Sequence, residues 1–254
     1  MKFLNQLIPW LSSVLIFILT EQLLKTPHQA SFLVPLAIVV IILSIWQLTG
    51  RNFFSRKFWQ NIITPTLFLV SSLFYLSFLE GSVFKQFFII TLSILFWILF
   101  KVVFLRWHLP IKYQTHSLEN ISTHLDLITV FFVASSLFSL LVFLGISSWF
   151  IIIIFAVIML ILSSQISWVS EANLSEVLPF LLVISLGVTE IFWAVSFLPT
   201  SVYVGGLIVA LSYYLMSGIS RNWLLGIKEG KVVKRYLLIS SIILVIVLLT
   251  AKWF

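Results

Sequence analysis

The stretch GVTEIFWAVSFLPTSVYVGG, residues 187–206, joins the end of one long apolar run to the start of the next. Pro199 separates the two runs. Together with its neighbouring residues, each run reaches the length of about 20 residues that a helix needs to cross a bilayer. The first run contains one carboxylate, Glu190. The stretch therefore predicts two transmembrane helices, and it places an acid inside the apolar part of the first.

The same apolar character extends over the whole chain. Hydrophobic residues make up 61% of the 254 residues, charged residues make up 9%, and the mean hydropathy is +1.18. A soluble protein has about 25% charged residues. We therefore expect an all-α polytopic bundle, with residues 1–254 as a single integral membrane domain. The nine predicted transmembrane helices span residues 4–20, 31–49, 62–79, 86–106, 127–146, 149–169, 177–198, 201–219 and 234–252.

Two features of this helix count need a test in the structure. Only Gly145 to Ser148 separates the fifth and sixth predicted helices, so that pair is open to a different interpretation. The polar stretch from His108 to Asp126 is interpreted as a loop. One extra helix beside a four-plus-four arrangement remains an alternative to an irregular bundle.

The basic residues predict the orientation of the chain. With nine spans, 12 of the 15 Lys and Arg residues lie on the side of the N-terminus, and Lys25, Lys85 and Lys252 lie on the other. Because Lys and Arg accumulate in cytoplasmic loops, we expect a cytoplasmic N-terminus and an outside C-terminus. The 12 residues are Lys2, Arg51, Arg56, Lys57, Lys101, Arg106, Lys112, Arg221, Lys228, Lys231, Lys234 and Arg235.

This asymmetry also accounts for the net charge of +7 without a nucleic-acid partner. The expected partners are the lipid bilayer of a cell (plasma) membrane, and a second copy or another membrane protein. The stretch RNWLLGIKEGKVVKR, residues 221–235, mixes basic and apolar residues at the cytoplasmic face. It is a candidate for contacts with anionic lipids, and a plain basic loop is the alternative.

Glu190 is the main candidate functional residue. An ionised carboxylate inside the bilayer costs at least about 2.5 kcal/mol, so the group must be protonated, paired or in contact with a wet cavity. On a helix it shares a face with Gly187, Trp193 and Ala194, and small residues let a second helix approach. We therefore expect Glu190 to point into the bundle. Its role is either an interhelical hydrogen bond or a protonatable site in a polar cavity.

Three further residues complete the candidate binding set. Trp193 and Tyr203 flank Pro199 and are placed to line an outward pocket near Glu190, although an interfacial or packing role is the alternative. Lys101 is the basic residue that lies well inside a span and is therefore a candidate partner for Glu190. The two residues are offset by about two helical turns, and Lys101 can instead extend to the membrane surface.

Little in the sequence points to catalysis. The chain has no cysteine and one aspartate, Asp126, so thiolate sites and paired-aspartate metal sites are excluded. His108, His116 and His124 recur every eight residues, which is not the spacing of a helical metal site, although a loop can bring histidines together. We predict no catalytic residue, no bound metal and no cofactor.

The carboxyl-terminal third contains TEIFWAVSFLPTSVYVGG, YYLMSGISRNWLLGIKEGKVVKRYLL and a terminal AKWF. It resembles an uncharacterised multi-pass membrane protein family of candidate-phylum bacteria, which implies a bacterial source and no particular activity. Three functions follow as hypotheses. The first is a non-enzymatic membrane component or assembly subunit, and the second is a small-solute or ion transporter with Glu190 as the coupling site. The third is a lipid enzyme that uses the histidine loop.

Overall fold

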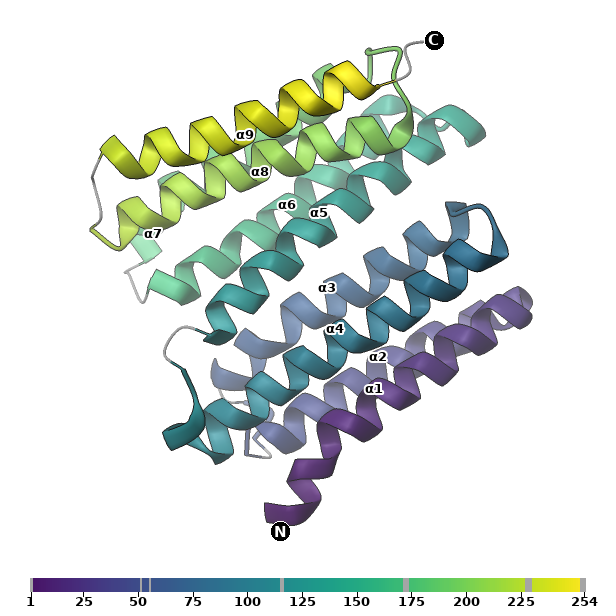
Figure 1. Cartoon of the computed structure of the whole chain (residues 1–254), viewed down its shortest axis with the longest axis vertical. Coiled ribbons are helices and arrows are strands. Elements are labelled where there is room, and N and C mark those ends of the chain that lie inside the picture. Colours follow the sequence, from purple (N-terminus) through teal and green to yellow (C-terminus); the bar gives the residue numbers. More distant parts are fainter. Residues whose placement is uncertain are drawn as a thin grey trace. The chain divides into compact units, whose positions relative to one another are not determined.

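The computed structural model describes residues 2–50, 52–54, 56–114, 117–170, 174–226 and 230–251. Within these ranges the chain forms nine α-helices and two short 3-10 helices, without a β-strand (Figure 1). The elements are α1 (Lys2–Lys25), η1 (Pro27–Gln29), α2 (Ala30–Leu48), α3 (Arg56–Phe78), α4 (Ser82–His108), η2 (Pro110–Lys112), α5 (Ser117–Leu144), α6 (Ser148–Ser170), α7 (Leu174–Val195), α8 (Val202–Leu224) and α9 (Gly230–Thr250).

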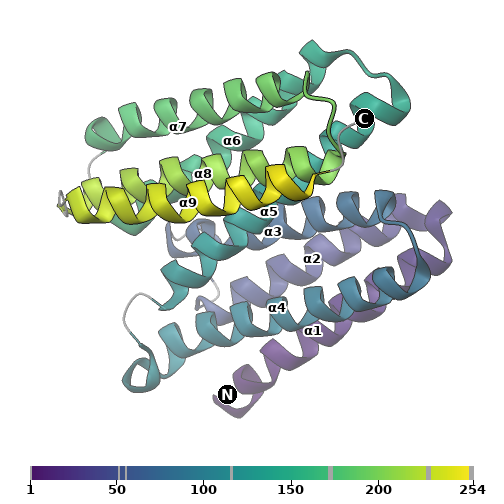
Figure 2. The ribbon, with the colours of Figure 1, turned by 45° about the horizontal axis from the view of Figure 1, so that its top comes forward.

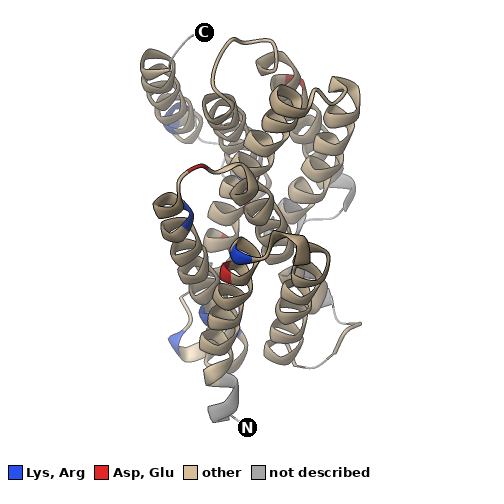
Figure 3. Cartoon of the chain, turned by 90° about the vertical axis from the view of Figure 1, so that its right-hand side faces the viewer, with Lys and Arg blue, Asp and Glu red and all other residues tan. Residues whose placement is uncertain are grey.

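All nine α-helices in the described part of the chain are long and apolar enough to cross a membrane. Most of the ribbon carries neither acidic nor basic residues (Figure 3). The predicted fold class, an all-α bundle of nine transmembrane helices, is therefore confirmed, and the chain is a multi-pass integral membrane protein. The orientation of the termini stays a prediction.

The doubtful boundary between the fifth and sixth helices is real. α5 ends at Leu144 and α6 begins at Ser148. Between them, Gly145 has a φ of +60°, a left-handed conformation that glycine adopts without a steric penalty. This residue lets the chain reverse within three residues.

The N-terminal end of α5 differs from the prediction. The helix begins at Ser117, so residues 117–126 extend it by a polar segment that was predicted to be loop. Arg106 Nη1 lies 2.7 Å from Glu119 Oε1, and the Tyr113 hydroxyl donates a hydrogen bond to Glu119 Oε2 at 3.1 Å. Burial raises the pKa of Tyr113, which keeps the phenol protonated as that donor. Hydropathy missed this extension because charged and hydroxyl side chains lower its mean hydropathy, although they contribute to its contacts.

The contacts divide the chain into two compact units, residues 1–125 and 126–254, with the boundary inside α5. A single integral membrane domain over the whole chain stays a prediction. In unit 1, α1 contacts α2 and α4, and α2 also contacts α3 (Figures 1 and 2). Phe96 packs against Phe68 and Phe100, and a buried hydrogen bond of 2.6 Å joins Ser12 and Ser44.

Unit 2 has an aromatic centre. Phe192 of α7 stacks between Phe138 of α5 and Phe155 of α6, with ring centroids 4.4 and 4.2 Å apart. On α8, Gly206 faces Ser135 and the backbone carbonyl of Phe131 so closely that even a Cβ atom would collide with the Ser135 hydroxyl. A close approach of this kind is typical of small residues at helix interfaces in membranes. Together these contacts hold α5, α6, α7 and α8 in one core.

Candidate functional site

Glu190 is exposed on α7, and the expectation that it points into the bundle is not met. The buried face of α7 includes Val177, Ile184, Val188 and Phe192, each 0% exposed, together with Ser185 and Thr189. Gly187 faces Met216 of α8, where an added Cβ would lie 2.8 Å from the methionine methyl group. The small residue thus marks the contact with α8, and Glu190, three positions further on, lies outside that contact.

Glu190 lies in the C-terminal third of α7. α7 ends at Val195 and not at residue 198, so Glu190 lies five residues, or about 7 Å, inside the end of the helix. Side chains on a helix tilt toward its N-terminus. The carboxyl group is therefore carried away from the nearer helix end and toward the middle of the span.

Exposed side chains continue on both sides of Glu190 with a regular spacing. We name four residues of this helix the α7 stripe: Val183, Leu186, Glu190 and Trp193, all of them exposed. Their separations alternate between three and four residues, which is the pattern of the contact positions in a left-handed helix pair, where the mean repeat is about 3.5 residues. In such a pair a single polar contact residue fixes the register. Glu190 is the single polar contact residue of the α7 stripe.

The aromatic candidates Trp193 and Tyr203 lie near the end of α7 and in the first turn of α8. Trp193 packs beside Trp149 of α6 and Phe197, with ring centroids 6.3 and 5.9 Å apart. Tyr203 lies in the first turn of α8 and is 36% exposed. The contacts of Trp193 favour the interfacial interpretation, because tryptophans at helix ends accumulate at the membrane surface.

Lys101 belongs to α4 in unit 1, whereas Glu190 belongs to unit 2. The lysine is exposed, and its Nζ lies 4.6 Å from the centroid of the Trp97 ring. A cation in this position is attracted by the aromatic face. The contact that the structure gives Lys101 is thus with an aromatic ring of its own helix.

Among the acids whose burial the structure describes, it buries Asp126, which the sequence placed at the end of a loop. It lies within α5 and is 4% exposed. Tyr213 of α8, 3% exposed, is close enough to interact with it electrostatically. The sequence does contain a signal for this burial. Asp126 lies three, four and seven positions before Thr129, Val130 and Val133, which are buried, so a helix places all four residues on one face.

The histidines lie in different settings. His108 ends α4 and stacks on Phe104 at 5.0 Å, and His124 Nδ1 lies 2.6 Å from the Asn120 carbonyl oxygen. His116 lies outside the described residues. In the described ranges no group of three or more His, Asp or Glu residues is arranged to hold a metal ion.

No protein-family model, curated protein or solved structure matches this chain. The resemblance of the carboxyl-terminal third therefore stays a prediction, as does the bacterial source. The α7 stripe places the exposed polar group of Glu190 where lipid or another helix must meet it.

Proposed function

We propose that this chain is a non-enzymatic membrane component that associates with a second copy of itself along the α7 stripe. Glu190 then forms an interhelical hydrogen bond with Glu190 of the second copy. The observation that supports the proposal is the position of Glu190. It is exposed at a contact position of the stripe, inside a membrane-spanning helix, and forms no hydrogen bond or ion pair with any other described residue.

Leaving this acid in contact with lipid tails is costly, and a second copy offers the matching group. Two identical chains cross a membrane in the same direction, so two α7 helices meet in parallel. In a parallel pair about a two-fold axis, each contact residue meets its own counterpart at the same depth. A neutral carboxyl group has one donor and free acceptor sites. Two such groups therefore satisfy each other.

The proposal predicts that Glu190→Leu weakens the dimer. An interhelical hydrogen bond in a membrane contributes about 1–2 kcal/mol, so the dissociation constant should rise about 5- to 30-fold. Glu190→Gln keeps a donor and an acceptor and should stay within about threefold of the unmodified chain. Sedimentation equilibrium of the purified full chain in a neutral, density-matched detergent measures these constants.

Lys101→Leu is the matched control, because it removes another exposed charge from a membrane-spanning helix of the other unit. Its dimer should dissociate as the unmodified chain does. A chain that is monomeric at every concentration, or a Glu190→Leu dimer as tight as the original, contradicts the proposal.

Transport is a second candidate function, and the observation that favours it is the buried Asp126 rather than Glu190. An acid inside a transmembrane helix with a polar neighbour such as Tyr213 is a common element of proton and ion paths.

If the chain conducts protons, full-chain proteoliposomes with an internal pH dye should show a proton flux above that of protein-free liposomes. Asp126→Asn should then lower the flux to that background and Glu190→Gln should not. Wild-type flux at background level removes this candidate.

A further inference from the structure

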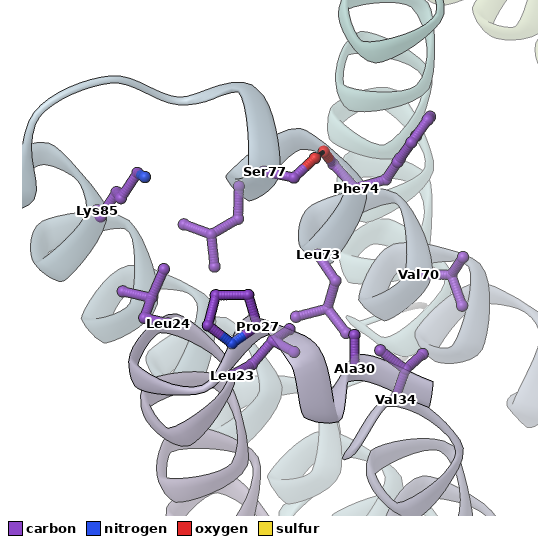
Figure 4. Close-up of a pocket in the computed structure, with 11 residues that line it drawn as sticks. Leu23, Leu24, Pro27, Ala30, Val34, Val70, Leu73, Phe74, Ser77 and Lys85 are labelled. Atoms are coloured by element: carbon purple, nitrogen blue, oxygen red, sulfur yellow. Dashed lines mark hydrogen bonds between the residues drawn. The ribbon is translucent and has the colours of Figure 1, made fainter. Parts of the chain in front are cut away.

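Unit 1 contains a pocket at one end of its helices. Its volume is about 530 Å³, within the range of about 300–1,000 Å³ that is typical of ligand sites. The end of α1, the 3-10 helix η1, the start of α2, the end of α3 and the start of α4 surround it (Figure 4). Two stretches that are distant in the sequence, residues 23–34 and 70–85, thus form one cavity.

The polar and apolar groups of this pocket are segregated. Lys85 and Ser77 lie at one end, beside the connection between α3 and α4 (Figure 4). Val34, Val70 and Leu73 lie farther from Lys85, among further aliphatic side chains, and Pro27 lies between them and Lys85. A ligand that fits must therefore have an apolar body and one polar or charged end.

Lys85 supplies a positive charge that no described carboxylate neutralises. Its side chain is half-buried, and it forms no ion pair within the described part of the chain. The carboxylate of Glu21 is engaged elsewhere, because one oxygen lies 3.2 Å from Lys25 and the other accepts a hydrogen bond from Gln86 at 2.9 Å. Lys85 also stands in the first turn of α4, where the helix dipole adds positive potential.

The depth of the pocket matches the boundary between headgroups and acyl chains. Lys85 lies three residues, or about 5 Å, inside the span that begins at Ser82. Val34 and Leu73 lie further along the apolar spans of α2 and α3. The charged end of the pocket is thus nearer to the membrane surface, and the apolar end extends into the bilayer.

We propose that this pocket binds one acyl chain of an anionic phospholipid, with the phosphate group held by Lys85. The aliphatic lining accepts the chain, and the unpaired ammonium group forms a charge-assisted hydrogen bond to the phosphate. The site is separate from the basic cytoplasmic loops, because Lys85 is one of the three basic residues on the opposite side in the predicted orientation. It does not depend on the proposed pairing of α7.

Native mass spectrometry of the full chain in neutral detergent tests the charged end. One molecule of phosphatidylglycerol should bind tightly to each chain. Phosphatidylcholine with the same acyl chains should bind at least about tenfold more weakly. Lys85→Gln should weaken phosphatidylglycerol binding at least about tenfold, the effect of losing a hydrogen bond to a charged group. Lys101→Gln removes the same charge from the other end of α4 and should leave the tight site unchanged.

Filling the pocket tests the apolar end. Ala30→Phe places a ring in the cavity and should abolish the tight site, whereas Val39→Phe, on an exposed face of the same helix, should not. Equal binding of both lipids, or equal losses in Lys85→Gln and Lys101→Gln, overturns the proposal. Displacement of phosphatidylglycerol by millimolar inorganic phosphate, with phosphate binding retained in Ala30→Phe, assigns the site to a free anion and overturns it as well.

Discussion

Phe192→Ala should lower the free energy of unfolding by about 3 kcal/mol, the largest effect of a single substitution that we expect in this chain. Phe192 is 0% exposed and stacks between Phe138 and Phe155, so its removal opens a cavity among three helices. In soluble proteins this change costs about 3–5 kcal/mol. We expect the lower part of that range, because an unfolded chain in a membrane keeps its side chains in apolar surroundings.

Thermal or SDS-induced unfolding of the full chain in mixed micelles, followed by circular dichroism, measures this loss. Phe143→Ala is the matched control, since Phe143 lies on α5 of the same unit and is 66% exposed. It should change the free energy of unfolding by less than about 0.5 kcal/mol. Equal losses in the two variants contradict the aromatic centre described for unit 2.

Gly206→Ala should cost about 2–3 kcal/mol, although it adds only one methyl group. The new Cβ would collide with the Ser135 hydroxyl and lie 3.2 Å from the carbonyl oxygen of Phe131. Because that oxygen belongs to the backbone, α5 and α8 must move apart to admit the methyl group. Overpacking in a well-packed core costs about 1–3 kcal/mol, and we expect the upper part of that range.

A second change distinguishes this collision from a general effect of alanine. Ser135→Gly removes the hydroxyl and the Cβ that the methyl group meets and leaves only the carbonyl oxygen of Phe131, so the double variant should recover more than half of the lost stability. Gly230→Ala is the control, because an added Cβ there meets no atom within 4 Å. The same unfolding titration measures the free energy of unfolding of the unmodified chain, Gly206→Ala, the double variant and Gly230→Ala. Failure of the double variant to recover stability contradicts the close approach of α5 and α8.

Hydropathy predicted the helices well because the membrane imposes their length and composition on the sequence. It could not find the first turns of α5, where Arg106, Tyr113 and Glu119 hold a polar extension outside that rule. Because the predicted helix began after Asp126, the sequence analysis assigned this residue to a loop. In the structure Asp126 is a buried residue of α5.

The candidate site was harder to predict than the helices. The spacing along α7 shows correctly which residues share a face with Glu190, but it does not show which face is buried. Gly187 suggested a helix contact, and it makes one with Met216 of α8, at the edge of the face that carries Glu190. The pocket around Lys85 had no local signal, because two stretches that are far apart in the sequence, residues 23–34 and 70–85, form it.

The pairing of α7 is the central claim, and the cysteine-free sequence offers a direct test. Leu186→Cys introduces one thiol in the α7 stripe, and Val157→Cys introduces one on an exposed face of α6 at a comparable distance from the helix end. Mild oxidation in membranes should produce a disulfide-linked dimer of Leu186→Cys, because contact residues of a parallel pair approach within the Cα distance of a disulfide. Adding Glu190→Leu should reduce the yield, and Val157→Cys should remain monomeric. Equal cross-linking of both single variants, or of neither, would contradict the account.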